Sequence, residues 1–179
     1  YHRMYDYTVD PDQQVTVTCG ATEAMAAVFL AMIDPGDEVI VFDPFYENYG
    51  PDAILAGAKP VFVPLEPPGW HFDPQRLRDA FTERTKAIIV NTPHNPTATV
   101  WTRADLDRLA ALTRGTGIVV VADEVYEHIV FDGATHASCA AHPELAARSF
   151  VVSSFGKTYH ITGWKVGYIL APRELMAEF

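Results

Sequence analysis

The sequence contains little cysteine: its only two cysteines, Cys19 and Cys139, are far apart and form no CxxC pair. A small fold built on disulfide bonds is therefore excluded, and a reduced, cytoplasmic protein is expected. Metal-ligand motifs are absent as well, because none of the seven histidines belongs to an HExxH sequence. No metal site is predicted.

No apolar run approaches the roughly 18 residues of a membrane-spanning helix, and no segment resembles the apolar core of a signal peptide. Basic residues are also few: 13 lysines and arginines face 23 aspartates and glutamates, which gives a net charge of −10 at pH 7. We therefore expect neither a membrane nor a nucleic acid as a partner. A single phosphate can still be held locally by backbone amides and one or two cations.

Short apolar runs rich in β-branched residues alternate along the chain with helical patterns. The alternation predicts an α/β domain with a doubly wound, mostly parallel sheet that is sandwiched between helices. No internal boundary is predicted, so residues 1–179 are expected to form one domain. Strands are predicted at 15–18, 38–43, 60–65, 86–91, 117–123, 149–154 and 167–171, and helices at about 22–33, 47–57, 74–83 and 102–114.

Small or polar residues follow five of the predicted strands. Ligands in doubly wound sheets bind at the carboxyl ends of the strands, so these five segments are candidates for one binding site. In chain order they are "CGATEA", "PFYENY", "TPHNPT", "ADEVYE" and "SSFGK".

The segment "TCGATEAM" runs from a strand into a helix, and Gly20 and Ala21 leave this turn uncluttered. Free backbone amides at Ala21 and Thr22 would suit a phosphate. An ordinary strand–helix turn is the alternative. A P-loop is excluded because no GKS or GKT sequence follows.

Asp123 directly follows an apolar run, so its carboxylate is expected to be half buried and to need a cationic partner. A protonated heterocyclic nitrogen would serve, and Tyr126 offers a phenol three residues later. The alternative is that Asp123 caps the following helix. Glu124 and Glu127 are expected to face solvent or to support the structure.

Two further segments offer ligand contacts. Prolines on both sides of His94 and Asn95 stiffen their loop, so the Asn95 amide could donate to a phenolate-like oxygen at low entropic cost. His94 itself is expected to pack within the loop. In "DPFYENY", Tyr46 or Tyr49 could cover the face of a flat ligand, whereas Phe45 is expected to pack in the core.

Lys157 stands at a strand exit among small residues, in "VVSSFGK". It is either solvated or partly desolvated, and a desolvated lysine has a lowered pKa and becomes a nucleophile toward carbonyls. The SxxK pattern that starts at Ser154 also occurs in penicillin-recognising serine enzymes, but no SDN motif accompanies it here. Lys165, eight residues later, could pair with an anion such as phosphate.

Taken in order, "GATEA", "FY", "NTPHNPT", "DEVY", SxxK and "GWKVGY" resemble the motifs of the class I and II aminotransferases of fold type I. The resemblance covers nearly all of residues 15–171 and is specific because six motifs occur in the correct order. It implies the large domain of an enzyme that uses pyridoxal 5'-phosphate (PLP). The signature of such enzymes is a lysine Schiff base with an acidic partner at the pyridinium nitrogen.

The resemblance also implies roles for the residues in those motifs. Lys157 would form the Schiff base and then shuttle the proton between the α-carbon of the amino acid and the cofactor. Asp123 would keep the pyridinium nitrogen protonated, and Tyr46 would stack on the ring. Asn95 and Tyr126 would hydrogen-bond the ring oxygen. The phosphate would be bound by Ala21, Thr22, Ser154 and Lys165.

Within the family, "NTPHNPTATVW", "DEVYEHIVF" and "SSFGKTYHITGWKVGY" are most similar to the methionine aminotransferase group, a neighbour of the kynurenine aminotransferases. This similarity implies transfer of an amino group from a hydrophobic or sulfur-containing amino acid, methionine-like or aromatic, to a 2-oxo acid. Ala98 departs from the glycine that is usual in "NPTG", which bears on the subgroup and not on the cofactor.

Both ends of the sequence look cut, because "YHRMYDY" contains no start signal and "RELMAEF" stops early in a helical pattern. We therefore expect a part of a longer protein. The family's arginine for the substrate carboxylate would lie beyond Phe179. In the homodimer that the family implies, the tyrosine that reaches the partner's phosphate would lie before Tyr1. The 179 residues alone could therefore lack full activity.

Two alternatives remain open at this point. A carbon–sulfur β-lyase of the same fold would use the same cofactor, and its products, pyruvate and ammonia, would distinguish it. A non-catalytic, PLP-sensing domain of a transcription regulator would need a basic helix-turn-helix segment, which this acidic chain does not contain.

Overall fold

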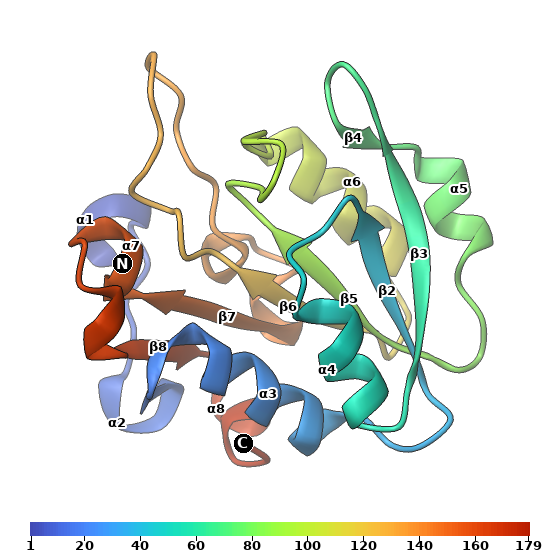
Figure 1. The fold of residues 1–179 in the computed structure, drawn as a ribbon, viewed down its shortest axis with the longest axis horizontal. Helices are drawn as coiled ribbons and strands as arrows, with labels where there is room; N and C mark the ends of the chain where they lie inside the picture. Colours follow the sequence, from blue (N-terminus) through green and yellow to red (C-terminus); the bar gives the residue numbers. More distant parts are fainter.

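Eight strands form one sheet in the order β1-β8-β7-β6-β5-β2-β3-β4, and the computed structural model describes all 179 residues around it (Figure 1). The predicted strands are all present, most within one or two residues of their expected bounds. The short β4 was not predicted, because it forms only through pairing with β3. The bounds are β1 Val15–Thr18, β2 Glu38–Asp43, β3 Lys59–Glu66, β4 His71–Phe72, β5 Thr85–Asn91, β6 Val119–Asp123, β7 Ser149–Ser154 and β8 Gly167–Leu170.

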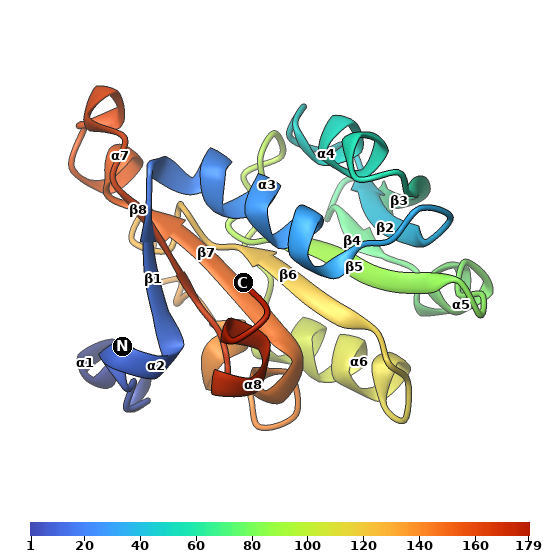
Figure 2. The same ribbon diagram turned by 90° about the horizontal axis from the view of Figure 1, so that it is seen from below.

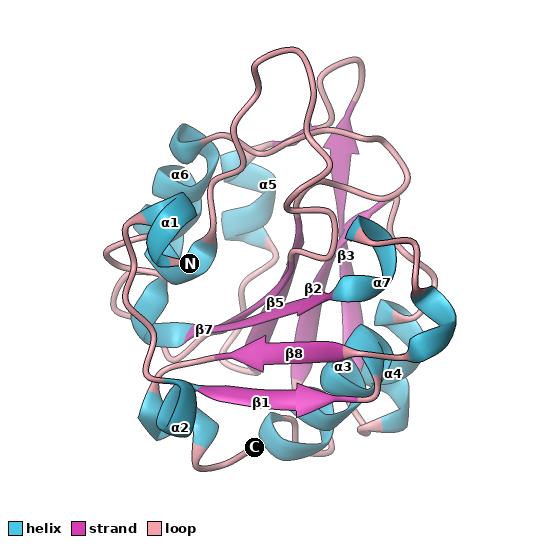
Figure 3. Ribbon diagram, turned by 90° about the vertical axis from the view of Figure 1, so that its left-hand side faces the viewer, coloured by secondary structure: helices cyan, strands magenta, loops and turns pink.

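The centre of the sheet is parallel and its two edges are antiparallel. Strands β3, β2, β5, β6 and β7 run in the same direction, whereas β8 runs antiparallel to both β7 and β1. Figure 3 shows this reversal in the neighbouring arrows of β1, β8 and β7. The predicted doubly wound, mostly parallel sheet is therefore confirmed, and the carboxyl ends of its central strands meet at one edge.

Helices cover both faces of the sheet (Figure 2). Helices α3 (Gly20–Met32) and α4 (Tyr49–Leu55) lie on one face, and α5 (Pro74–Asp79) and α6 (Arg103–Thr113) lie on the other. Helices α4 and α5 are shorter than the sequence pattern indicated. Short helical turns complete the fold: α1 His2–Tyr5, α2 Pro11–Gln14, α7 Phe155–Thr158, α8 Arg173–Met176 and the 3-10 turns Cys139–Ala141, Ala146–Arg148 and Thr162–Trp164.

The central strands are apolar on both faces because each face supplies a separate core. In β2, Ile40 and Phe42 pack toward α5 and α6, whereas Val39 and Val41 pack toward α3 and α4. This alternation follows from the two-residue repeat of a strand. Burial of a large aliphatic side chain stabilises the fold by roughly 1.5–3 kcal/mol, so the two cores hold the sheet and its strand ends in place.

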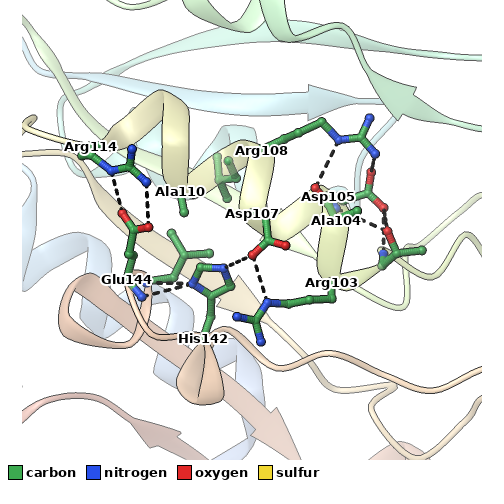
Figure 4. A network of polar contacts seen from close by, with 12 residues as sticks. Arg103, Ala104, Asp105, Asp107, Arg108, Ala110, Arg114, His142 and Glu144 are labelled. Carbon is green, nitrogen blue, oxygen red and sulfur yellow. Dashed lines mark hydrogen bonds and ion pairs between the residues drawn. The ribbon is translucent and has the colours of Figure 1, made fainter.

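Helix α6 begins with a capping box formed by Thr102 and Asp105. The Thr102 hydroxyl accepts the Asp105 backbone amide, and the Asp105 carboxylate accepts the Thr102 backbone amide. The ion pair between Arg114 and Glu144 and the contact of His142 with Asp107 attach α6 to the segment that precedes β7 (Figure 4). In this network, the Asp107 carboxylate accepts hydrogen bonds from Arg103 and from His142.

Candidate active site

One cleft lies at the carboxyl ends of the central strands, and all nine residues singled out from the sequence line it. They come from segments as distant in the chain as the start of α3 and the turn before β8. The predicted residues in this lining are Ala21, Thr22, Tyr46, Asn95, Asp123, Tyr126, Ser154, Lys157 and Lys165, and Gly20, Tyr49, Asn91, Val125, Gly156, Thr162 and Val166 line it as well.

Asp123 ends β6 and places a buried carboxylate at the base of the cleft. Burial raises the pKa of this carboxyl above its usual value. A hydrogen bond from the Tyr49 hydroxyl (2.7 Å), one from the Val125 amide (3.2 Å) and the charge of Lys157 act in the opposite direction. No helix begins directly after Asp123, since the next helical turn starts at Cys139, so the alternative that Asp123 caps a helix is wrong.

Tyr49 is a site residue whose contact with Asp123 the sequence did not predict. The pattern left Tyr46 and Tyr49 as equal candidates for covering a ligand, and the family resemblance pointed to Tyr46. Tyr49 is buried, and its hydroxyl donates a hydrogen bond to Asp123. Tyr46 is half-buried, and its ring lies edge-on to the ring of Tyr49, with the two centroids 5.8 Å apart. Phe45 packs face to face on Phe62 at 5.2 Å, which agrees with its expected packing role.

The loop after β5 is tied to the end of β6 through Asn91. The Asn91 side-chain amide donates to the Asp123 carbonyl (2.9 Å), and its oxygen accepts the backbone amide of Asn95 (2.8 Å). The Asn95 side chain lines the cleft and has no hydrogen-bond partner within the chain. His94 is buried against Thr97, and burial lowers its pKa, so the expectation of a packed loop histidine is confirmed.

The start of α3 has the features of an anion site. The side chain of the N-cap residue, Cys19, makes no capping hydrogen bond to this 13-residue helix, and the Glu23 carboxylate accepts only the backbone amide of Cys19. Gly20 adopts a left-handed φ of 78° at the first helical position. A Cβ atom on Gly20 would lie 3.3 Å from Cε and 3.4 Å from Nζ of Lys165, so the ammonium group stands directly beside the turn. Backbone amides and a cation that converge in this way suit a phosphate.

Gly167 allows β8 to approach the start of α3. A Cβ atom there would lie 2.5 Å from the Gly20 carbonyl carbon and 2.7 Å from the Ala21 nitrogen, which no real Cβ tolerates. The sequence therefore keeps a residue without a side chain where the strand crosses the helix terminus. The "GWKVGY" segment thus supplies both the cation, Lys165, and the close contact that holds the anion site together.

Lys157 lies on α7, with its ammonium 5.8 Å from the centre of the Tyr126 ring. Its side chain is exposed, so the interpretation that this lysine is partly desolvated is wrong for these 179 residues. A cation beside an aromatic face gains electrostatic stabilisation, which orients the amine over the cleft.

Glu124 and Glu127 are both buried, which excludes the expected solvent-facing position and leaves the structural one. Glu124 accepts the Cys139 amide (2.8 Å), and burial raises its pKa to about 8. Glu127 accepts the hydroxyls of Ser153 (2.8 Å) and Tyr168 (2.9 Å) and so joins β7 to β8 beneath the cleft. Nothing in the "DEVYE" pattern distinguishes such glutamates from exposed ones, because their partners are distant in sequence.

The structure contains neither a membrane-spanning helix nor a cluster of metal-binding side chains. None of the helices combines the length and apolar character that crossing a bilayer would require. No three His, Cys, Asp or Glu side chains converge to hold a metal ion.

Comparison with known proteins identifies the family of this site. The family model for aminotransferase class I and II matches residues 1–178. Methionine aminotransferase of Escherichia coli is 51% identical over 176 residues, which cover 98% of this chain and 46% of that protein. Kynurenine–oxoglutarate transaminase 1 of Homo sapiens is 41% identical over 179 residues, covering 94% of this chain and 42% of that protein.

Solved structures give the same result. The crystal structure of an Escherichia coli protein described as having a methionine aminotransferase function superposes with a TM-score of 0.96 at 50% identity and covers 99% of this chain and 47% of its own. N-succinyldiaminopimelate aminotransferase from Mycobacterium tuberculosis gives a TM-score of 0.95 at 44% identity, with 99% and 47% covered. The chain thus spans about half the length of the curated relatives it matches.

Proposed function

The chain belongs to the aminotransferases of class I and II, and on that premise we propose that it forms the cofactor-binding part of a PLP-dependent aminotransferase. The proposed substrates are a hydrophobic or sulfur-containing amino acid, methionine-like or aromatic, and a 2-oxo acid. Similarity to a methionine aminotransferase and to a kynurenine transaminase supports this substrate class. The observation that carries the proposal is the convergence of Asp123, Lys157 and the uncapped start of α3 on one cleft.

The residues of the cleft fit the charges of PLP at both ends of the molecule. The buried Asp123 carboxylate needs a cation, and a protonated ring nitrogen is one. The start of α3, with Ser154 and Lys165, offers donors and positive charge to a phosphate. Between these ends, the Asn95 amide and the Tyr126 hydroxyl are free to donate to the ring oxygen, and Tyr46 can cover the ring face.

The chemistry follows from what each residue can do. When bound, PLP supplies an electron sink next to the α-carbon of the amino acid. The Asp123 carboxylate would hold a proton on the ring nitrogen and so keep this sink strong. The Lys157 amine would hold the cofactor by condensing with its carbonyl, with loss of water, and the amine, once displaced by the substrate, would take the proton from the substrate α-carbon and return it. Tyr46 and Tyr126 hold the flat ligand in the plane that this proton transfer requires.

Borohydride reduction followed by peptide mapping tests the proposal. Reduction of the protein with PLP is expected to leave a permanent label on Lys157, and Lys157→Ala is expected to carry none. A label on Lys165 or Lys86 instead would contradict the assignment. Product analysis with a 2-oxo acid and, in turn, methionine or a cysteine S-conjugate then separates amino transfer from β-elimination. The conjugate carries its sulfur on the β-carbon, so elimination from it releases a thiol, pyruvate and ammonia, whereas amino transfer releases no ammonia.

We further propose that the protein is a cytoplasmic homodimer. The side chains of Tyr159 and Trp164 are 60% and 75% exposed on the turns that carry Lys157 and Lys165. Apolar rings exposed so close to a candidate active site are typical of surfaces that a second subunit covers. The free thiols of Cys19 and Cys139 suit a reducing compartment.

A further inference from the structure

His136 is a buried histidine outside the cleft, and no sequence motif pointed to it. Its side chain is 1% exposed, and both ring nitrogens have partners. Nε2 lies 3.0 Å from the Thr92 carbonyl oxygen, and Nδ1 lies 2.8 Å from the Tyr5 hydroxyl. Because a carbonyl can only accept, Nε2 carries the hydrogen, and Nδ1 accepts the hydrogen of Tyr5. Burial lowers the pKa of His136 to about 4, so the neutral ring persists near neutral pH.

The acceptor of this histidine, Thr92, is the first residue of the loop that carries Asn95. Its backbone amide donates to the Asp123 carbonyl (3.1 Å), and its hydroxyl accepts the Trp101 amide (3.0 Å). Asn91 completes the connection, because it bonds both to Asp123 and to the Asn95 amide. The loop is therefore held to the end of β6 on one side and to His136 on the other.

Two further contacts hold His136 and the segment that carries it. Tyr5, on α1, is 131 residues away in sequence and fixes Nδ1. Glu124 accepts the backbone amide of Cys139, three residues after His136, and so ties this segment to the residue that follows Asp123. The result is a buried polar cluster directly behind the residues that would contact the ring oxygen and the ring nitrogen of PLP.

We propose that His136 is a positioning residue for the cofactor site, which acts through the Thr92 carbonyl to hold the Asn95 side-chain amide in place. The proposal rests on the proposed function, because Asn95 has a cofactor to contact only if PLP binds. Removal of the imidazole leaves a buried carbonyl without its donor, and the loop is then free to shift. A shift of this kind loosens the contact between Asn95 and the ring oxygen without touching any group that lines the cleft.

The chain offers a matched control in His142. It is also buried, at 3% exposure, and also hydrogen-bonded at both ring nitrogens. Its partners, however, are the carboxylate of Asp107, on the outer face of α6, and the backbone amide of Glu144, in the segment that precedes β7 (Figure 4). His136→Leu and His142→Leu therefore remove equally buried imidazoles, and only the first bears on the cofactor loop.

The experiment measures three quantities in the complete protein: thermal unfolding without PLP, the PLP dissociation constant and the pH midpoint of the cofactor absorbance band. We expect His136→Leu to weaken PLP binding about fivefold, the scale of one hydrogen bond. It should also move the pH midpoint in the same direction as Asn95→Ala. His136→Gln, whose amide can still donate to Thr92, should restore both values to within about twofold. His142→Leu should lower only the unfolding temperature.

The outcomes separate the inference from the proposed function. If the wild-type protein develops no cofactor band with PLP, the proposed function fails and the inference fails with it. If the wild type develops the band but His136→Leu behaves as His142→Leu does, the proposed function stands and the inference is wrong. If His136→Leu does not fold, Tyr5→Phe serves as the test, because it removes the hydrogen-bond donor to Nδ1 of His136. It should shift the pH midpoint in the same direction as Asn95→Ala but by a smaller amount. If the midpoint does not shift, the proposal is wrong.

Discussion

Asp123 is the deeply buried charge of the cleft, and its neighbours determine the pH at which it can act. Burial raises its pKa, and the hydrogen bond from Tyr49 opposes that rise. A carboxylate holds a ring nitrogen protonated only while it is itself ionised. Every donor to Asp123 therefore extends the range of activity toward lower pH.

Tyr49→Phe should move the acid limb of the activity profile to higher pH. The variant removes the donor at 2.7 Å from Asp123 and keeps the packed ring. The pKa of Asp123 then rises further, and its protonation sets in at a higher pH as the pH falls. The measurement is kcat/KM and PLP affinity between pH 5 and 9, with Tyr7→Phe as the control. An unchanged acid limb would show that another group controls it.

The residues of the site differ in how far sequence could reveal them. Asp123, Asn95 and Lys157 follow strands, and a parallel sheet brings its strand ends together whatever the details of packing. Tyr49 could not be told from Tyr46, because which ring turns inward depends on how α4 packs. His136 and Glu124 were beyond prediction, since their burial depends on partners such as Tyr5 that are far away along the chain.

At the scale of elements, the crossing of β8 with the start of α3 sets the shape of the anion site. Gly167→Ala would bring a Cβ within 2.5 Å of the Gly20 backbone, where no flexible side chain can give way. We expect a loss of about 1–3 kcal/mol in the free energy of unfolding and a weaker affinity for PLP, because the α3 amides and Lys165 separate. Urea unfolding and PLP titration measure the two effects.

Gly163→Ala is the matched control for this change. It lies four residues earlier in the same segment, and a Cβ there would meet no atom within 4 Å. Its effect should stay within about 0.5 kcal/mol. Equal losses in the free energy of unfolding in the two variants would mean that the close contact between Gly167 and the start of α3 does not determine stability at this crossing.

The elements themselves were predictable where their patterns are local. Strands β2, β5 and β7 are continuous apolar runs between polar turns. The start of α6 depends on only two nearby residues, Thr102 and Asp105. The turn α7 was not foreseen, because "FGKT" contains no helical repeat and only the geometry between β7 and β8 makes it helical. Helices α4 and α5 ended early for a related reason: their last predicted residues join turns that lead into β3 and β5.

At the scale of the whole molecule, we expect these 179 residues, expressed alone, to bind PLP weakly and to transaminate negligibly. Lys157, Lys165 and Thr22 are exposed, so water competes for the charges that should hold the cofactor. The curated relatives are about twice as long, and the rings of Tyr159 and Trp164 beside the cleft are exposed. Residues that cover this side would raise the strength of every polar contact within it and would help to orient the substrate.

The comparison is between the 179-residue chain and a longer form that carries the remaining length of its relatives. Each is titrated with PLP and then assayed with methionine and a 2-oxo acid, and its mass in solution is measured. The short chain should give a weaker cofactor band and no measurable transfer, whereas the longer form should give both, as a dimer. Trp164→Ser in the longer form should favour the monomer, since it removes an exposed ring from the surface proposed to be covered. If the short chain transaminates at the rate of the longer form, the cleft is complete within residues 1–179, and its exposed lysines bind the cofactor and catalyse the reaction without further residues to cover them.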